Sequence, residues 1–555
     1  MEHILAALAE IATLHTLLLM SAGAIAGLLA GAIPGFTIAM AVVLALPFTF
    51  SMTASQGIAT MIGVYVGGLS GGLMSGILIG IPGTPSSVAT TFDGFPMARQ
   101  GRPGLALGLG VWSSFFGGTI AAVCLIAIAP QLARIGLEFQ PWDYFALVFF
   151  ALTITASLAG KSLIKGLISG ALGLLIATVG EEDINGVSRF DFGSDYLQEG
   201  FAFLPVLIGL FAFSQLMSDI RDPAEARRSL AQTGDIDIRI EHLKAARIVL
   251  SKWKNLVRSS LIGIFTGILP AAGSSISNIL AYDQAKKASA TPEKFGTGFE
   301  DGIIAPEAAN NATAGGSLIT MMALGIPGDI VTAVMLGALL IHDVVPSPSF
   351  ITEAPVLAYS IFIAFFFANF LVLFFQSIAL RLFVLVTKVK MYVLAGIILA
   401  YCGIGVFALH NIVNDMWTLL IFGVVGYAMR NLGFPLAPMI LGVVLGPIAE
   451  RWLARAVAIS TDMSNFITHP WSVFFLTLSL FSMGFGMYQR DRGKKRWTLY
   501  YTPLMVLALT PAMFMMEGFI RPGIGIVMLI GGLYALYQAH NKAAGFQPAA
   551  GGTPR

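Results

Sequence analysis

The tetrapeptide Gly-Ile-Pro-Gly occurs twice, at residues 80–83 and 325–328, and both copies interrupt strongly apolar stretches. Proline removes a backbone hydrogen bond from a helix, and the flanking glycines let the chain leave helical geometry. In a bilayer such a break persists only where protein or a water-filled cavity satisfies the freed groups. The half-helix after a break presents N–H groups that suit an anion, and the half-helix before it presents carbonyls that suit Na⁺. We therefore expect a binding site near mid-membrane once in each half.

Hydroxyl and amide side chains that could hold a carboxylate without a formal cation gather near these breaks. With the two breaks and one predicted hairpin tip included, the residues expected to bind substrate are Pro34, Gly35, Gly83, Thr84, Ser86, Ser87, Ser274, Ser275, Asn310, Asn311 and Gly328. If the segment is helical, Glu307, Asn310 and Asn311 lie on one face. The alternative for each hydroxyl is a bond to its own helix or to a neighbouring one.

Three acidic residues lie beside the breaks: Asp93, Glu307 and Asp329. An ionisable group within membrane helices is a functional candidate by default, so we expect all three to sense a coupling cation. Asp329 directly follows the second break, and its alternative role is to cap the next half-helix. A Na⁺ site is expected near Gly80, Asp93, Glu307 and Gly325. No cofactor is expected beyond Na⁺ or H⁺ as the coupling ion.

The composition indicates an all-α polytopic membrane protein. Of the 555 residues, 56% are hydrophobic and 11% are charged, whereas soluble domains carry about 25% charged residues. Apolar runs of about 18 or more residues recur along the chain, and each is a candidate span. The basic segment 219–258 should be cytoplasmic by the positive-inside rule, and the acidic segment 181–200 should lie outside. The basic segment is interpreted as a topology signal and not as a nucleic-acid site.

Two ordered matches indicate an internal repeat. The stretch "GLLAGAIPGFT" (27–37) resembles "GIFTGILPAAG" (263–273), and 71–83 resembles 315–328 with one residue inserted. Each half therefore reads as a re-entrant hairpin, with its tip at 34–35 or 270–271, followed by a broken helix. Lys and Arg flank opposite ends of the two halves, which favours an inverted, elevator-like arrangement over a parallel repeat.

These signals predict the boundaries of the chain's parts. The expected segments are a first repeat at 17–218, a cytoplasmic basic linker at 219–255, a second repeat at 256–490, extra membrane segments at 498–540 and a disordered tail at 541–555. The N-terminus has no Lys or Arg in its first 20 residues. It lacks the charged start of a cleaved signal peptide, so we expect it to be retained.

Four stretches carry a family resemblance: "GIPGTPSSVATTFDGFPMARQGRPGLALG", "RFDFGSDYLQEG", "APEAANNATAGGSLI" and "LGIPGDIVTAVMLGALLIH". Over about residues 20–490 the chain resembles the large membrane subunit of the tripartite tricarboxylate transporters, the TctA family. The resemblance implies a bacterial inner-membrane secondary transporter for carboxylates, driven by Na⁺ or H⁺. It also implies a small four-span membrane subunit and a periplasmic solute-binding protein as partners. A homodimer is compatible with these expectations.

Other functions stay open at this point. An intramembrane enzyme would need a nucleophile–base pair or metal ligands at depth, and the seven histidines show no ligand-like spacing. We therefore expect no catalytic residues. A passive channel would explain broken helices but not the binding protein that the resemblance implies. Citrate, other tricarboxylates, C4-dicarboxylates and aromatic acids all fit as substrates.

Overall fold

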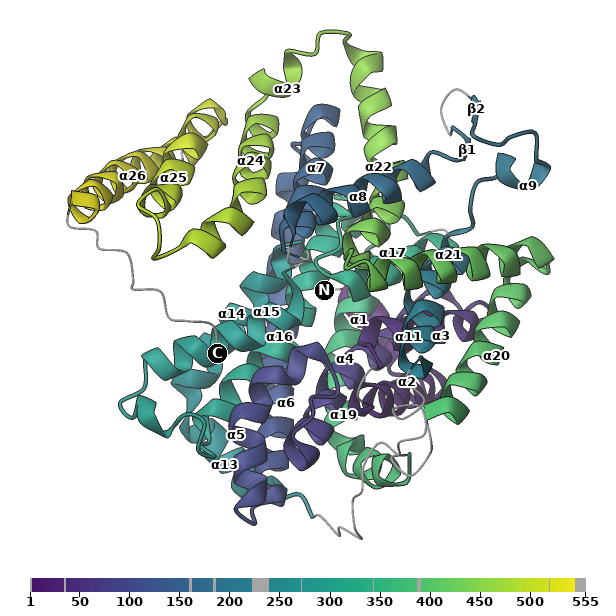
Figure 1. The fold of residues 1–555 in the computed structure, drawn as a ribbon, viewed down its shortest axis with the longest axis vertical. Coiled ribbons are helices and arrows are strands. Elements are labelled where there is room, and N and C mark those ends of the chain that lie inside the picture. The colour runs from purple at the N-terminus through teal and green to yellow at the C-terminus, as the bar shows by residue number, and fades with distance from the viewer. Residues whose placement is uncertain are drawn as a thin grey trace. The chain divides into compact units, whose positions relative to one another are not determined.

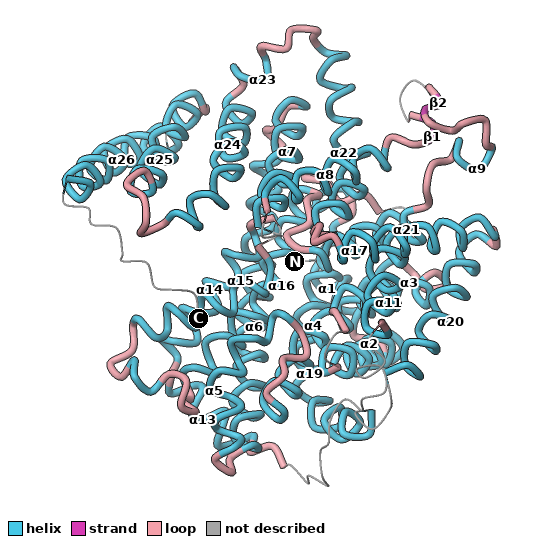
Figure 2. The backbone as a smooth tube through the Cα atoms, viewed as in Figure 1, coloured by secondary structure: helices cyan, strands magenta, loops and turns pink. Residues whose placement is uncertain are grey.

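The protein is described from a computed structural model, shown as a ribbon in Figure 1. The description covers residues 2–33, 36–158, 162–182, 186–221, 239–270, 272–342, 344–386, 391–518 and 520–544. These residues are almost all helical (Figure 2), apart from the short antiparallel pair β1 (Gly180–Glu181) and β2 (Ser188–Arg189). Within them, eight helices are long and apolar enough to cross a membrane. The prediction of an all-α polytopic membrane protein is confirmed.

The chain folds as two compact units. Unit 1 comprises Met1–Leu137 and Phe201–Leu432, and unit 2 comprises Glu138–Gly200 and Gly433–Arg555. This division follows contacts within the fold, so the repeat boundaries read from the sequence stay predictions. Residues 222–238 of the expected linker and the tail from 545 onward lie outside the described residues.

Unit 1 contains both GIPG breaks. Its first-half helices are α1 (Glu2–Ile11), α2 (Leu14–Ala32), α3 (Ile38–Thr49), α4 (Ala54–Ile79), η1 (Pro85–Ser87), α5 (Val88–Arg99) and α6 (Pro103–Gly136). Its second-half helices are α13 (His242–Ser251), α14 (Trp253–Ile268), α15 (Gly273–Lys287), η3 (Pro292–Lys294), α16 (Asp301–Leu324), α17 (Ile330–Ile341), α18 (Phe350–Glu353) and α19 (Pro355–Val386). The remaining helices are α10 (Phe203–Ile208), η2 (Gly209–Phe213), α11 (Ser214–Ile220), α20 (Met391–His410) and α21 (Val413–Asn431).

The two halves of unit 1 repeat the same helix contacts. Helix α2 packs on α4, and α14 packs on α16. Gly31 lies against the carbonyl of Gly68, and Gly267 lies against the carbonyl of Thr313, so a Cβ at either glycine would overlap that oxygen. When the two GIPG sequences are aligned with each other, Gly68 and Thr313 occupy equivalent positions, in agreement with their equivalent contacts, and no insertion is needed between them and GIPG. The one-residue insertion placed in this helix by the sequence is therefore wrong: the second half's extra residues lie between the hairpin and α16.

Both broken helices end in the same backbone conformation. The C-caps of α4 and α16 are Gly80 and Gly325, each with φ of 72°. Glycine adopts this left-handed conformation without the penalty that a Cβ imposes, which is why it commonly ends helices. The first glycine of each GIPG thus stops a helix, and the proline that follows cannot continue it.

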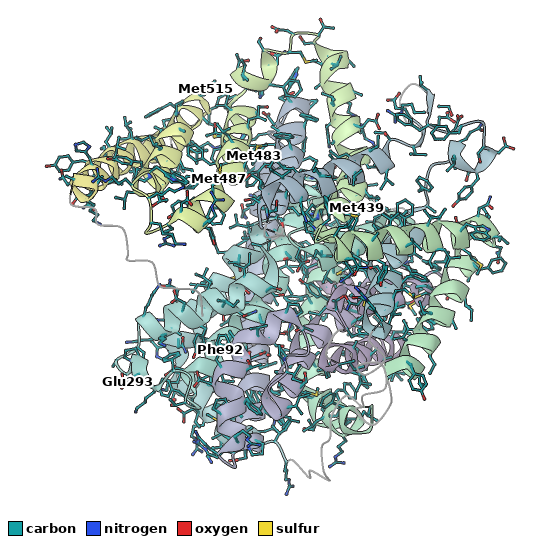
Figure 3. The ribbon with its side chains drawn as sticks, in the orientation of Figure 1. Phe92, Glu293, Met439, Met483, Met487 and Met515 are labelled. Atoms are coloured by element: carbon teal, nitrogen blue, oxygen red, sulfur yellow. The ribbon has the colours of Figure 1, made fainter. Side chains whose placement is uncertain are left out.

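Unit 2 is a separate helical assembly. It contains α7 (Pro141–Leu158), α8 (Leu163–Ala177), α9 (Asp195–Gln198), α22 (Leu436–Ile459), α23 (Asn465–Thr468), α24 (Pro470–Asp491), α25 (Thr498–Met515) and α26 (Ile520–Ala544). Helix α22 packs on α7 and α8, and α24 packs on α7 and α25. Arg189 forms a bidentate ion pair with Glu450 of α22, which raises the pKa of the guanidinium. Met487 and Met515 project from α24 and α25 (Figure 3), and both are exposed.

Candidate functional site

The two halves of unit 1 meet along a seam of buried polar side chains, which we name the polar seam. Three hydrogen bonds define it: Tyr65 donates to Asp329, Ser70 donates to Asn311 (2.9 Å), and Thr90 donates to Glu307 (2.5 Å). All six residues are buried. As residue numbers rise along the first half, those of the partners fall along the second. The two broken segments therefore run antiparallel where they touch.

The contacts around the seam are reciprocal. The second half's hairpin helix α15 contacts η1 and α5, which follow the first break. The first half's hairpin helix α3 contacts α17, which follows the second break. Each hairpin therefore lies beside the break of the other half.

Glu307 lies near the middle of the polar seam, on α16. Its Oε1 accepts a bond from Thr90 of α5 at 2.5 Å, and its Oε2 accepts one from Ser114 of α6 at 2.9 Å. The side chain is fully buried, and it forms no ion pair with any of the residues that the structure describes. A buried carboxylate held only by neutral side chains lacks the compensating charge that would favour its ionised form, so it is suited to bind a proton or a cation.

One turn along α16, two amides contact α4. Asn310 donates to the carbonyl of Leu69 at 3.0 Å, and Ser70 donates to the Oδ1 of Asn311. Gln376 of α19 donates to the carbonyl of Ser70 at 3.4 Å. The Oδ1 of Asn310 and the Oε1 of Gln376 are buried acceptors without a hydrogen-bond partner. Buried acceptors of this kind are costly unless a donor or a cation reaches them.

The first break presents hydroxyls to the second hairpin. Thr84 and Ser86 hydroxyls are 2.9 Å apart, and Ser87 donates to the carbonyl of Thr84 at 2.9 Å. Asn278 of α15 donates to the carbonyls of Ser86 (2.7 Å) and Ser274 (2.9 Å) and, more weakly, of Ser275 (3.4 Å). The hydroxyl cluster after the first GIPG and the Ser/Asn cluster after the second hairpin tip are thus brought together.

The second break is capped by its own acid. The Oδ1 of Asp329 accepts bonds from the backbone N–H and the hydroxyl of Thr332, both at 2.8 Å, and forms a capping box at the start of α17. Its Oδ2 accepts the bond from Tyr65. The structure therefore gives Asp329 the capping role left open by the sequence. Thr84 occupies the corresponding position in the first half, so the first break has no carboxylate there.

Asp93 lies apart from Glu307 and is surrounded by donors. Its Oδ1 accepts bonds from the N–H groups of Gly296 (2.9 Å), Gly298 (2.9 Å) and Phe299 (2.8 Å), and its Oδ2 accepts one from the Tyr282 hydroxyl (2.9 Å). Both glycines have left-handed φ angles, 91° and 92°. Successive N–H groups arranged in this way make an anion-binding nest. The contacts favour Asp93 as an anchor between the halves.

Two glycines of the predicted substrate set are close-packed. A Cβ at Gly83 would overlap the carbonyl oxygen of Gly31, and a Cβ at Gly328 would overlap that of Gly267. Each break is therefore held directly against the first hairpin helix of its own half. Pro34 and Gly35, at the predicted first tip, lie outside the described residues.

The residues predicted to form the Na⁺ site lie in different local environments. Gly80 and Gly325 cap helices, while Asp93 and Glu307 bind different partners. The residues that the structure describes contain no group of three or more His, Cys, Asp or Glu placed to hold a metal ion. An oxygen site for Na⁺ would instead use carbonyls, amides and a single carboxylate, as around Glu307.

Sequence reasoning missed several members of the site: Tyr65, Ser70, Ser114, Tyr282 and Gln376. Each lies ten or more residues from the nearest GIPG sequence, so the breaks did not point to it. The loop that binds Asp93 carries a readable signal, because Gly296 and Gly298 alternate in "KFGTGFE". Alternating glycines permit the left-handed turns that direct consecutive N–H groups toward an anion.

Comparison with known proteins identifies the family of the chain. A model of the "Tripartite tricarboxylate transporter TctA family" matches residues 17–441. An uncharacterized 52.8 kDa protein of the TAR-I ttuC' 3' region of Agrobacterium vitis is 32% identical over 416 residues, covering 75% of this chain and 82% of the relative. An uncharacterized protein of the TAR-II ttuC' 3' region of the same organism is 32% identical over 234 residues, covering 42% of this chain and 97% of the relative. No solved structure matches the chain.

The match extends over most of the chain and includes both GIPG breaks, both hairpins and the polar seam. The resemblance read from the sequence is thereby confirmed, although the matched region ends at residue 441 and not near 490. Eight apolar helices agree with a multi-pass membrane protein. The chain belongs to the tripartite tricarboxylate transporter TctA family, as a membrane component of a transporter.

Proposed function

We propose that the protein is the permease subunit of a binding-protein-dependent symporter that imports a carboxylate across the bacterial inner membrane with Na⁺ or H⁺. The observation that carries this proposal is the polar seam, in which two broken helices from different halves enclose one fully buried glutamate. Its partners are a small four-span membrane subunit and a periplasmic solute-binding protein. Family membership supports these partners, because the family is named for tripartite transporters.

The carboxylate binds at the first break, beside Thr84, Ser86, Ser87 and the start of α15. Hydroxyls, amides and the N–H groups of the helix start supply donors without a formal positive charge. The second break is a poorer anion site, because Asp329 already occupies its N-terminus. Ser274 and Ser275 would contact the substrate from the second hairpin, whose Asn278 already bonds this break.

Coupling resides at Glu307. Its carboxylate lies one turn from Asn310 and Asn311 and within hydrogen-bond distance of residues from α5 and α6. Binding of a cation there would neutralise a buried charge and change the bonds that join the two halves. Asp93 serves as an anchor, because donors already surround its two oxygens.

The two halves are inverted in the membrane, and the domain that carries the breaks moves against a scaffold. The antiparallel pairing along the seam and the reciprocal hairpin contacts support an inverted repeat over a parallel one. Such repeats place substrate and ion sites at their interface near mid-membrane.

Uptake into proteoliposomes tests the proposal. The purified chain is reconstituted with and without its small subunit and binding protein, and labelled citrate, succinate and benzoate are offered under imposed Na⁺ or proton gradients. We expect accumulation of one of these acids only with all three proteins and only under one gradient. Rapid gradient-independent flux through the chain alone would indicate a channel. Conversion of the acid would indicate an enzyme.

A further inference from the structure

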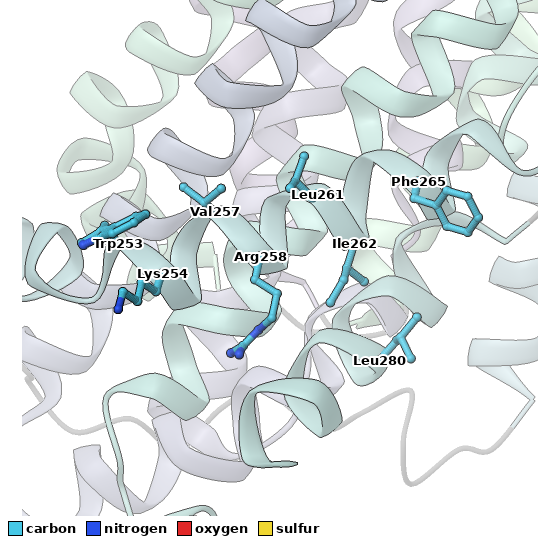
Figure 4. Close-up of a pocket in the computed structure, with 8 residues that line it drawn as sticks. All are labelled: Trp253, Lys254, Val257, Arg258, Leu261, Ile262, Phe265 and Leu280. Atoms are coloured by element: carbon cyan, nitrogen blue, oxygen red, sulfur yellow. The ribbon is translucent and has the colours of Figure 1, made fainter. Parts of the chain in front are cut away.

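The second hairpin of unit 1 has an open groove along its outer face (Figure 4). Its volume is about 530 Å³, and its lining comes only from α14 and α15: Trp253, Lys254, Val257, Arg258, Leu261, Ile262, Phe265 and Leu280. Trp253, Val257, Leu261 and Phe265 recur every fourth residue and form one apolar stripe. Phe265 is 63% exposed and Leu261 is 53% exposed. The stripe spans about 18 Å along the helix, against about 15 Å for one leaflet of a bilayer's hydrocarbon core.

Two cations lie beside the half of the apolar stripe that begins at Trp253: Lys254 near its end and Arg258 one turn further along. The Lys254 ammonium lies 5.8 Å from the ring of Trp253, and Arg258 donates to the neutral amide oxygen of Asn255 (2.7 Å). The Nε of Arg258 is buried and has no hydrogen-bond partner. Their neighbour Lys252 differs, because Asp301 neutralises it at 2.9 Å. Among the described residues, no acidic partner is recorded for Lys254 or Arg258.

A second, more polar cavity of about 480 Å³ adjoins the groove at these cations. It shares Trp253, Lys254 and Arg258 with the groove and adds Ser289, Thr291 and the Lys252–Asp301 ion pair, whose charges offset one another. An apolar channel, two cations and a polar chamber thus follow one another in space. This order matches the acyl chain, phosphate and headgroup of a phospholipid.

The corresponding groove of the first hairpin has a different lining. It measures about 470 Å³ and is lined mainly by residues of α2, α3 and α4, without Lys or Arg, together with Tyr401 of α20. The Tyr401 hydroxyl donates to the Leu44 carbonyl at 2.9 Å, and its ring stacks on Phe48 at 5.1 Å. The first groove therefore carries no cation and has an aromatic residue of α20 in its wall, whereas the second groove carries Lys254 and Arg258.

We propose that this groove binds one anionic phospholipid, with an acyl chain along the Trp253–Phe265 stripe and the phosphate between Lys254 and Arg258. The basic flank of α14 was predicted to face the cytoplasm, where anionic lipids concentrate and attract Lys and Arg beside the membrane. Trp253 is suited to the interface at the headgroup level. This site does not depend on the proposed substrate or coupling ion.

Native mass spectrometry of the detergent-purified full chain tests the proposal, with phosphatidylglycerol and phosphatidylcholine as probes. We expect one tightly retained phosphatidylglycerol and much weaker phosphatidylcholine. Lys254→Ala/Arg258→Ala should weaken phosphatidylglycerol binding roughly 25-fold, at about fivefold per cation. The matched control Lys286→Ala/Lys287→Ala removes the same charge outside the groove and should bind as the wild type does.

A second variant tests the apolar part without changing charge. Leu261→Trp should fill the groove and reduce phosphatidylglycerol retention, whereas Ile397→Trp, at an exposed position of α20, should not. Equal retention of the two lipids by the wild type, or equal loss in the Lys286/Lys287 control, would overturn the proposal. Complete displacement of the lipid by inorganic phosphate would also overturn it, because it would show a site for a free anion.

Discussion

Asp93→Asn separates an anchoring role from a coupling role. In the wild type, the carboxylate accepts bonds from three backbone N–H groups and one tyrosine hydroxyl. Hydrogen bonds to a charged group contribute about 1.5–3 kcal/mol, against about 0.5–1.5 kcal/mol for neutral ones. Four weakened bonds amount to about 4 kcal/mol, and the easier burial of a neutral amide offsets part of this. We expect a net destabilisation of about 2–4 kcal/mol, which corresponds to roughly 2–5 °C in Tm for a chain of this size.

The assay is the loss of monodisperse protein on heating in detergent, followed by size-exclusion chromatography. The matched control is Asp283→Asn, which breaks only the exposed pair between Asp283 and Lys287. Exposed pairs contribute about 0–1 kcal/mol, so the control should stay close to the wild type. The surviving Asp93→Asn protein should keep its cation dependence of uptake. If it is instead as stable as the control and has lost that dependence, Asp93 is a coupling residue and the anchoring argument fails.

Two further predictions concern packing and topology. Gly83→Ala should lower Tm and uptake together, because its Cβ would overlap the Gly31 carbonyl and overpacking costs about 1–3 kcal/mol. The control Gly396→Ala places its Cβ in open space and should be neutral. Equal behaviour of the two variants would contradict the close packing at Gly83. In a background without Cys124 and Cys402, single cysteines at Gln100 and Ser347 should label from the cytoplasm and the periplasm respectively, whereas labelling from one side would refute the inverted repeat.

The sequence predicted the two breaks, and it drew attention to several of the polar residues around them, because glycine, proline and polar residues within apolar stretches carry local signals; that these residues bind substrate stays a prediction. Thr84, Ser86 and Asn311 lie where the GIPG sequences indicated, and the hydroxyl cluster of one half meets the Ser/Asn cluster of the other. The match to one family across both repeats agrees with this. Local patterns were sufficient here, because a broken membrane helix must place polar groups beside the break.

The roles of the acids could not be predicted in this way. Asp93 and Glu307 look alike in the sequence, since each is a lone acid in an apolar region. They differ in the structure because backbone N–H groups of a distant loop surround Asp93, while the partners of Glu307 are neutral side chains. Backbone donors are present at almost every residue and leave little trace in composition. The formation of unit 2 from residues 138–200 and 433–555 could not be predicted for a similar reason, because it depends on the long-range packing of α7 and α8 on α22.

Glu307→Gln provides the most direct test of the proposed mechanism. Glutamine keeps the size of the side chain and can still bond Thr90 and Ser114, so folding should be preserved within about 1 kcal/mol. The measurement compares gradient-driven accumulation with counterflow exchange of the labelled acid in proteoliposomes that contain all three subunits. The account predicts that the wild type accumulates substrate under the coupling-ion gradient, while Glu307→Gln retains exchange but no longer accumulates. Accumulation by Glu307→Gln at the wild-type level under the same gradient would contradict it.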